Sequence, residues 1–250
     1  YEYRELADSI AYINFRHMRN LKKFNKFLRN TFRRIQAHHT RGLIVDLREN
    51  GGGNSSLGNA LLSYITDKPY RFSARIEWKI SAPLKQYLKE FVPASIRWLP
   101  VYYFTSMGRK IWNTPEGEFA VWEAKPTAPK PNPLRYRGPV CFLIGPGTFS
   151  SAMLLANGVA DYHLATLIGE ETGGRPNGFG EIYVFDLPNT RLQVSVSTKR
   201  FVRANGDVND RRGVLPDFTV RQSQADLEKG VDTVLQFARA WILKQPVKHN

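Results

Sequence analysis

The sequence predicts an α/β fold, and two patterns along the chain support this prediction. The first is a strand-like segment at Ile10–His17, an amphipathic helix at Asn20–His38 and a continuous apolar run at Gly42–Leu47. The second is an apolar run at Val140–Ile144 followed by a helical segment at Ser150–Asp161. The chain has 250 residues, of which 42% are hydrophobic, so it is long and apolar enough for one large core.

The first pattern is a β-α-β unit. The helix places its apolar residues at spacings of three and four, as an amphipathic helix requires. These residues are Leu21, Phe24, Leu28, Phe32 and Ile35. Its basic residues fall largely on the opposite side, which we expect to face solvent; they are Lys22, Lys23, Lys26, Arg29 and Arg33. The apolar run at Gly42–Leu47 is broken only by Asp46, which is typical of a buried parallel strand, so the two strands should be parallel and joined by a right-handed crossover.

The middle of the chain is harder to assign. From Tyr70 to Arg137 aromatic side chains are scattered among prolines and basic residues, so we expect a helical or irregular insertion, or a lid, within one domain spanning 1–250. A short strand at Leu164–Ile168 follows the Ser150 helix. Glu181–Asp186 and Arg191–Thr198 resemble a hairpin. A final helix is expected to begin near Ser223 and to continue past Trp241, which leaves the insertion as the least regular part of the chain.

Composition narrows the classes of partner. The formal net charge is +14, which is most simply a solvated basic surface and alternatively a means of attracting an acidic partner. No basic motif interleaved with aromatic residues resembles that of a known nucleic-acid-binding module, so nucleic acid is not expected as a partner. The single cysteine, Cys141, lies in an apolar run and should be buried. No run of 18 apolar residues occurs, so no membrane span is expected. Because the chain begins at Tyr1, we expect that a leader or an N-terminal region belongs before it.

A glycine-rich turn follows the Gly42–Leu47 strand, in the segment Asp46-Leu47-Arg48-Glu49-Asn50-Gly51-Gly52-Gly53. Glycines at the C-terminal end of a parallel strand allow several backbone N–H groups to point at one place. Such a turn can hold a phosphate or an oxyanion, and a plain tight turn is the alternative. No Gly-Lys-Ser/Thr follows, so the segment is not a P-loop.

A second turn, Gly145-Pro146-Gly147-Thr148-Phe149-Ser150-Ser151-Ala152, leads from a strand into a helix. A serine at this position exposes its Oγ, and the N-terminus of the helix favours negative charge that develops nearby. Serine is also a favoured helix N-cap, so capping is the alternative role of Ser150.

Four blocks in this order resemble the C-terminal processing, or tail-specific, serine peptidases. They are Asp46-Leu47-Arg48 with Asn50 and Gly52-Gly53; Thr148 to Ala152; Gly169-Glu170-Glu171-Thr172-Gly173-Gly174; and Gly213-Val214-Leu215-Pro216-Asp217. The resemblance spans roughly Ile10 to Val220, and it implies a catalytic domain with the Clp-protease/crotonase-like fold.

The resemblance also implies roles for individual residues. Ser150 would be the nucleophile that forms an acyl-enzyme with a peptide carbonyl. The backbone N–H groups of Gly52 and Ser151 would form the oxyanion hole. The implied substrates are peptides or unfolded protein termini. A bacterial, periplasmic or otherwise extracytoplasmic location, membrane anchoring through a removed leader, and assembly into a homo-oligomer are further expectations.

The sequence departs from the Ser/Lys branch of this family. The lysine of that branch lies 25 residues after the serine, where this chain has Arg175. Arginine does not deprotonate in proteins, so a Ser/Lys dyad in that arrangement is excluded. The nearest later lysine, Lys199, is expected to be a surface charge at a strand end. Another branch uses a Ser/His/Glu arrangement, in which Asp210 would occupy the place of the acid that orients the base.

The general base is therefore left open between three alternatives. It is supplied by a segment that precedes this chain, which is the alternative we favour; or it is His17, which follows a strand parallel to the one that precedes Gly52; or the protein is a non-catalytic relative. His39 precedes the Gly42–Leu47 strand and His163 follows the Ser150 helix, so both should lie far from the glycine turn.

Arg175 stands in a glycine-rich loop and could pair bidentately with a substrate carboxylate, such as a free C-terminus; a surface arginine is the alternative.

No His, Cys, Asp or Glu cluster has ligand spacing, so neither a metal nor a cofactor is expected. Two rivals to a peptidase stay open: a peptide-binding protein that has lost its base, and an acyl-CoA enzyme of the same fold.

Overall fold

A computed structural model describes residues 1–90 and 92–246. The chain forms two compact units. Unit 1 consists of Tyr1–Phe72, Lys125–Pro176 and Asp210–Asn250, and unit 2 of Ser73–Ala124 and Asn177–Asn209. The expected insertion at 70–137 thus contributes most of its length to unit 2, together with a second segment from later in the chain. Its expected role as a lid stays a prediction.

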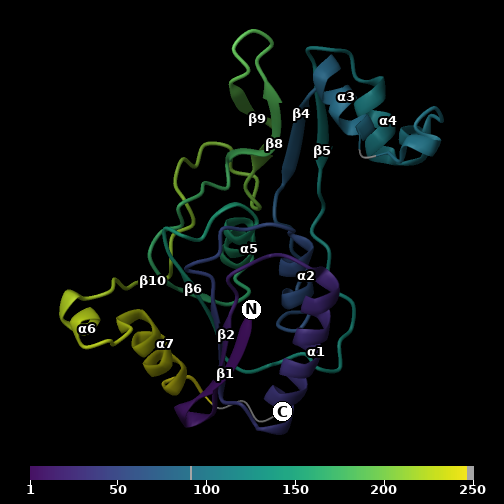
Figure 1. Ribbon diagram of the computed structural model, residues 1–250. Coiled ribbons are helices and arrows are strands. Elements are labelled where there is room, and N and C mark those ends of the chain that lie inside the picture. The colour runs from purple at the N-terminus through teal and green to yellow at the C-terminus, as the bar shows by residue number, and fades with distance from the viewer. Residues whose placement is uncertain (91, 247–250) are drawn as a thin grey trace. The chain divides into compact units, whose positions relative to one another are not determined.

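Unit 1 is built on a six-stranded sheet in the order β1-β2-β3-β6-β7-β10 (Figure 1). The strands are β1 Glu2–Leu6, β2 Ile10–Asn14, β3 Gly42–Asp46, β6 Val140–Ile144, β7 Thr166–Gly169 and β10 Phe218–Thr219. All neighbours are parallel except β1 and β2. The structure confirms four expected strands: β2 at the start of the chain, β3 before the glycine turn, β6 before the serine turn and β7 after the Ser150 helix. β1 was not expected, because its sequence alternates exposed charged residues with only two half-buried ones, Tyr3 and Leu6.

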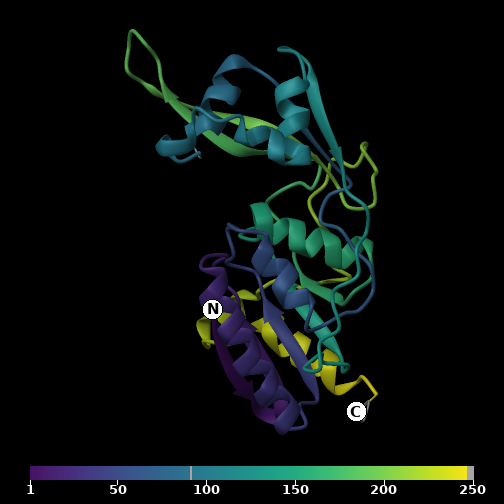
Figure 2. The ribbon, with the colours of Figure 1, turned by 90° about the vertical axis from the view of Figure 1, so that its right-hand side faces the viewer.

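Helices cover both faces of this sheet (Figure 2). The larger core joins one face to α1 (Leu21–Ala37), α2 (Ser56–Leu62) and α5 (Ser150–Asp161). The smaller core joins the other face to α7 (Thr233–Leu243) and contains the buried Cys141, as expected. In α1 the fully buried side chains include Phe24, Leu28 and Phe32, and burial of each stabilises the fold by roughly 1.5–3 kcal/mol.

The expected single C-terminal helix is wrong in one respect, because the structure has two helices there. α6 (Gln224–Glu228) ends before Gly230, whose φ of +68° is in the left-handed region. Glycine at such a position ends a helix at little cost. Asp232 then caps α7 by accepting a hydrogen bond from the N–H of Leu235 at 2.9 Å.

Unit 2 has a four-stranded antiparallel sheet in the order β5-β4-β9-β8. Its strands and helices are β4 Arg75–Lys79, α3 Ala82–Glu90, α4 Ser106–Asn113, β5 Phe119–Glu123, β8 Gly178–Asp186 and β9 Gln193–Val202. The hairpin of β8 and β9 confirms the one expected from the sequence. The region 70–137 is more regular than expected, since it supplies β4, β5 and both helices around a small core that contains Trp78, Ile80 and Ile111.

No helix in residues 1–90 and 92–246 is long and apolar enough to cross a membrane.

Candidate active site

Ser150 lies at the start of α5, directly after the turn that follows β6. Its φ is +50°, a conformation that residues other than glycine adopt rarely, and its side chain is exposed. The N-cap position of α5 is assigned to Phe149, and within residues 1–90 and 92–246 no hydrogen bond from the Ser150 hydroxyl to the helix backbone is found. A strained backbone at an exposed serine is a feature found at functional sites.

The serine turn is fastened to the glycine turn by two fully buried polar residues, Thr148 and Asn50. The hydroxyl of Thr148 donates to the carbonyl oxygen of Leu47 at 2.8 Å and accepts from the N–H of Gly145 at 3.1 Å. The N–H of Phe149 donates to the carbonyl oxygen of Asn50 at 3.0 Å. Both turns therefore meet at the C-terminal edge of the parallel sheet, as their positions after two neighbouring strands predict.

Gly52 is the point of closest approach between the turns. A Cβ atom on this residue would lie 2.8 Å from Ser150 Cβ, 2.8 Å from the nitrogen of Ser151 and 2.9 Å from the carbonyl oxygen of Phe149. Its φ of +96° also requires glycine. The backbone of Gly52 thus lies against Ser150 and Ser151, the two residues expected to share a site with it.

The N–H groups of the expected oxyanion hole differ in their partners. The N–H of Gly52 donates to Oδ1 of Asn50 at 2.9 Å. For the N–H of Ser151 no acceptor is found within residues 1–90 and 92–246. The hydroxyl of Ser151 donates to the carbonyl oxygen of Gly53 at 2.5 Å and so adds a further bond between the turns. Nδ2 of Asn50 donates to the carbonyl oxygen of Phe15, which fixes the amide that holds Gly52.

His17 lies at the same edge of the sheet as the glycine turn. The next residue, Met18, donates its N–H to the carbonyl oxygen of Gly52 at 3.3 Å and accepts from the N–H of Asn54 at 2.8 Å. His17 is exposed. The residue next to His17 is therefore bonded to Gly52, which in turn lies against Ser150.

The other histidines in the described part of the chain lie elsewhere. His38 ends α1 and pairs with Glu5 at 2.9 Å. His39 precedes β3 and His163 follows the C-terminal end of α5, as expected. His249 lies outside the described residues.

The two later blocks of the resemblance are joined to each other. The carboxylate of Glu171 accepts from the guanidinium of Arg212 at 2.6 Å and from the N–H of Gly213 at 2.7 Å. The hydrogen bond from Arg212 holds the pKa of Glu171 below its usual value. The hydroxyl of Thr172 accepts from the N–H of Val214 at 2.8 Å. Asp210 lies at the start of this segment, and its carboxylate accepts from the N–H of Arg212 at 2.8 Å.

Arg175 follows a glycine that packs on the start of α5. A Cβ atom on Gly174 would lie 3.2 Å from the ring of Phe149 and 3.3 Å from Cε of Met153. Arg175 itself is exposed. Lys199, by contrast, belongs to unit 2, where its ammonium pairs with Glu181 at 2.9 Å and lies 4.7 Å from the centre of the Trp78 ring. It is therefore a partnered charge of that sheet.

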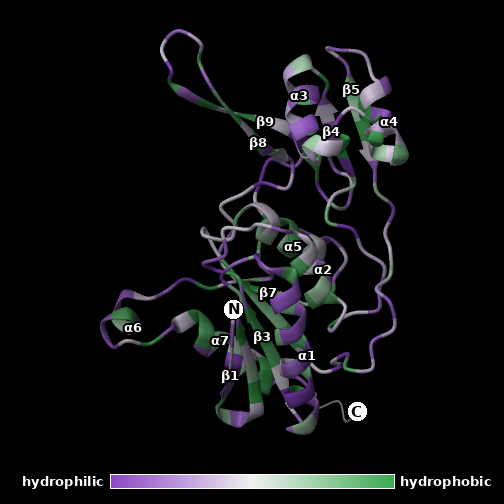
Figure 3. Ribbon diagram, turned by 45° about the vertical axis from the view of Figure 1, so that its right-hand side comes forward, coloured by the Kyte–Doolittle hydropathy of each residue, from purple (hydrophilic) through white to green (hydrophobic). Residues whose placement is uncertain are grey.

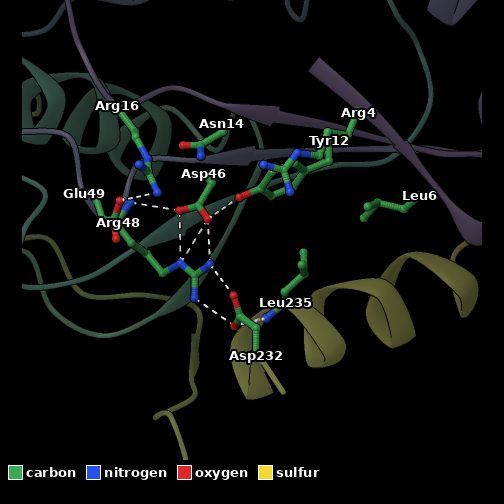
Figure 4. A pocket seen from close by; sticks show the side chains of 10 residues that line it. All are labelled: Arg4, Leu6, Tyr12, Asn14, Arg16, Asp46, Arg48, Glu49, Asp232 and Leu235. Atoms are coloured by element: carbon green, nitrogen blue, oxygen red, sulfur yellow. Dashed lines mark hydrogen bonds and ion pairs between the residues drawn. The ribbon is translucent and has the colours of Figure 1, made fainter. Parts of the chain in front are cut away.

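A polar cluster that the sequence did not indicate lies behind the glycine turn (Figure 4). The guanidinium of Arg48 is bound at 2.6 Å by the carboxylate of Asp46 and at 2.6 Å by that of Asp232, and Tyr12 donates to Asp46 at 2.8 Å. These residues line a cavity of about 380 Å³. Burial, and then the adjacent Asp46 carboxylate, raise the pKa of the Tyr12 hydroxyl far above its usual value. The only hint in the sequence was Asp46, a charge inside an apolar run.

This cluster connects α7 to the site through the backbone of Arg48. A Cβ atom on Gly147, in the serine turn, would lie 2.3 Å from the carbonyl oxygen of Arg48. The side chain of Arg48 is fixed from the strand by Asp46 and from the helix cap by Asp232. Arg48 thus positions the junction of the two turns, while its guanidinium is held by Asp46 and Asp232.

Comparison with known proteins gives one family and a set of solved structures. The model of peptidase family S41 matches residues 9–220. A search of curated protein sequences gave no significant match. A candidate peptidase from Parabacteroides merdae is similar over 98% of this chain and 64% of its own, with a TM-score of 0.66 and 20% identity. Mature CPAF in complex with lactacystin is similar over 94% of this chain and 52% of its own, with a TM-score of 0.65 and 19% identity.

The photosystem II D1 C-terminal processing protease is similar over 84% of this chain and 42% of its own, with a TM-score of 0.51 and 18% identity. At these identities the solved structures establish the fold, which is Clp-protease-like. The chain spans between about two fifths and two thirds of the length of these proteins. Because the family match covers most of the sequence, the chain belongs to peptidase family S41, a family of serine-type peptidases.

Proposed function

We propose that this protein is a serine endopeptidase in which Ser150 is the nucleophile. The observation that carries the proposal is the approach of Gly52 to Ser150 and Ser151, which leaves no room for a side chain between the glycine turn and the start of α5. The exposed hydroxyl of Ser150, its strained backbone and the N-terminus of a twelve-residue helix beneath it support the same role.

In the proposed reaction Oγ of Ser150 attacks a peptide carbonyl carbon while a base accepts the hydroxyl proton. The carbonyl oxygen becomes an oxyanion, which the N–H groups of Ser151 and Gly52 stabilise. Collapse of this intermediate breaks the C–N bond, the base returns the proton to the leaving amine, and water then hydrolyses the acyl-enzyme. The N–H of Gly52 must exchange its bond to Asn50 for one to the oxyanion.

His17 is the candidate base within the described chain, because its neighbour Met18 is bonded to the glycine turn. Asp210 is the candidate orienting acid, on the strength of its position before the Gly213 block. A base supplied by a segment outside this chain is the alternative, and the experiment below separates the two.

Labelling by a fluorophosphonate probe tests the nucleophile. We expect the wild-type protein to be labelled, Ser150→Ala to be silent, and Ser56→Ala, which removes another exposed serine near the site, to be labelled at the wild-type rate. Labelling of Ser150→Ala would contradict the proposal.

The same probe tests the base. If His17 is the base, His17→Ala lowers the labelling rate by roughly 100-fold or more; an unchanged rate assigns the base to another segment.

Arg175 is proposed as a binding residue for a carboxylate of the substrate, because it is exposed and its neighbour Gly174 packs against the start of α5. We expect Arg175→Gln to raise KM for peptides with a free C-terminus and to leave KM for the matching C-terminal amides unchanged. The rise in KM should be about tenfold, as expected for the loss of one charge-assisted hydrogen bond. Equal effects on acids and amides would contradict this role.

A second candidate function is peptide binding without catalysis. Two observations favour it: the N–H of Gly52 is bonded to Asn50, and an arginine stands where the Ser/Lys branch has its base. This candidate predicts no labelling of Ser150 and unimpaired binding of peptides by Ser150→Ala. The family match favours a peptidase over an acyl-CoA enzyme of the same fold.

The choice of unfolded protein termini as substrates, an extracytoplasmic bacterial location and assembly into a homo-oligomer are proposals that rest on the family resemblance. Cleavage of peptides with and without a free C-terminal tail tests the first of them.

A further inference from the structure

The exposed face of α1 carries positive charge alone. Ten residues of this helix are exposed, and none of them is acidic. Six are cations: Lys22, Lys23, Lys26, Arg29, Arg33 and Arg34. The opposite face is buried in the core of unit 1. In Figure 3 the ribbon of α1 alternates between hydrophilic residues, in purple, and hydrophobic ones, in green.

Several cations of unit 1 pair with an acidic side chain. Arg4 pairs with Glu2, Arg16 with Glu49, and Arg48 with two aspartates. For the six cations of α1 no ion pair is found in the part of the chain that the structure describes. The positive charge of this face is therefore available to another molecule.

The stability of the helix does not explain this arrangement. Lys22 and Lys23 lie in the first turn, which has no acidic residue, and cations there oppose the helix dipole. Lys22 with Lys26, and Arg29 with Arg33, are like charges at a spacing of four, which repel each other across the helix surface. The arrangement costs stability, so a binding role gives it a physical reason.

The geometry of this face fits a flat anionic surface. Lys22, Lys26, Arg29 and Arg33 lie along one side of the helix over a length of about 16 Å. Asn25 and Asn30 stand between them and can hydrogen-bond to phosphate oxygens. None of the exposed residues of α1 is aromatic, so the face offers no platform on which unpaired bases could stack. The apolar side of α1 is used in the core, so binding would be electrostatic without insertion.

We propose that the exposed face of α1 is a docking surface for a bilayer that contains anionic phospholipids. Lysine and arginine clusters on a helix are attracted to such surfaces, and each cation near the surface changes partitioning by roughly fivefold. The inference does not depend on the activity proposed for Ser150.

The test is co-sedimentation of the whole protein with vesicles of equal parts phosphatidylglycerol and phosphatidylcholine. One variant replaces Lys22, Lys26, Arg29 and Arg33 by Gln. A matched variant replaces four exposed lysines elsewhere, Lys110, Lys125, Lys130 and Lys229, and so removes the same charge. We expect the α1 variant to lose binding by at least about fiftyfold and the matched variant to change by less than about fivefold.

Binding should also weaken as salt is raised from about 0.1 M to about 0.5 M, because screening shortens the reach of surface charges. Thermal unfolding of the α1 variant controls for folding, and we expect its Tm to equal or exceed that of the wild type since like charges have been removed. Equal losses in the two variants would overturn the proposal, because net charge alone would then explain binding. Binding of a DNA duplex through α1 without binding to the vesicles would overturn it as well.

Discussion

At the scale of single residues the site depends on two backbone conformations, those of Ser150 and Gly52. Both have positive φ, at +50° and +96°. Ser150 carries the strain of a conformation that suits glycine, and the surrounding turn bonds hold it there. Gly52 makes the close approach possible because it has no side chain.

Replacement of this glycine is a direct test. In Gly52→Ala the added Cβ would meet Ser150 Cβ and the nitrogen of Ser151 at 2.8 Å each. We expect hydrolysis or probe labelling to fall by at least about 100-fold, as for loss of an oxyanion donor, and the protein to lose about 1–3 kcal/mol of stability. The control is Gly51→Ala, where no atom lies within 4 Å of the added Cβ. An active Gly52→Ala protein would show that the turns do not need to meet at this residue.

At the scale of elements Thr148 joins the ends of β3 and β6. Its buried hydroxyl bonds Gly145 in its own turn and Leu47 in the other. Thr148→Val keeps the shape and leaves a carbonyl and an N–H without their partner. We expect a loss of about 2–3 kcal/mol in the free energy of unfolding, measured with urea.

Thr148→Ser is the matched variant, because it keeps the hydroxyl and removes one methyl group. We expect it to lose only about 1 kcal/mol. If Val and Ser cost the same, the hydroxyl does not join the turns.

At the scale of the whole molecule an ion pair links α7 to the strand that leads into the glycine turn. Burial is the largest influence on Asp232 and opposes its ionisation, but the hydrogen bonds from Arg48, the charge of Arg48 and the backbone N–H groups of Val234 and Leu235 together outweigh burial, so the pKa of Asp232 lies below its usual value. A carboxylate whose pKa is lowered by folding stabilises the protein at neutral pH. This contribution is lost as the pH falls through the lowered pKa of the folded state.

Asp232→Asn tests this link, because Asn can still cap α7 while it cannot pair with Arg48 as an anion. We expect a loss of about 1 kcal/mol at pH 7, since the carboxylate is partly exposed. The difference from the wild type should shrink as the pH is lowered toward about 3. A difference that does not change with pH would mean that the charge of Asp232 is not what stabilises the helix.

Much of unit 1 could be predicted from the sequence because its signals are local. The run Val140–Ile144 and the helix Ser150–Asp161 agree with the structure residue for residue, since a continuous apolar strand and a serine turn are each readable over a few positions. The two turns could be expected to meet because parallel strands end at the same edge of a sheet. The sequence also placed His17 at that edge.

The rest was decided by contacts between distant segments. Unit 2 pairs β4 with β9 across more than a hundred residues, and no local pattern announces such a pairing. The bond of Asp232 to Arg48 joins segments far apart in the sequence, and so does the bond from the Asn50 amide to Phe15 that orients the acceptor of the Gly52 N–H. The sequence by itself thus determined the family and the α/β fold, and it indicated Ser150 as the candidate nucleophile. Tertiary structure decided which N–H groups are available beside Ser150 and what holds the turns together, because both depend on groups that meet only when the chain is folded.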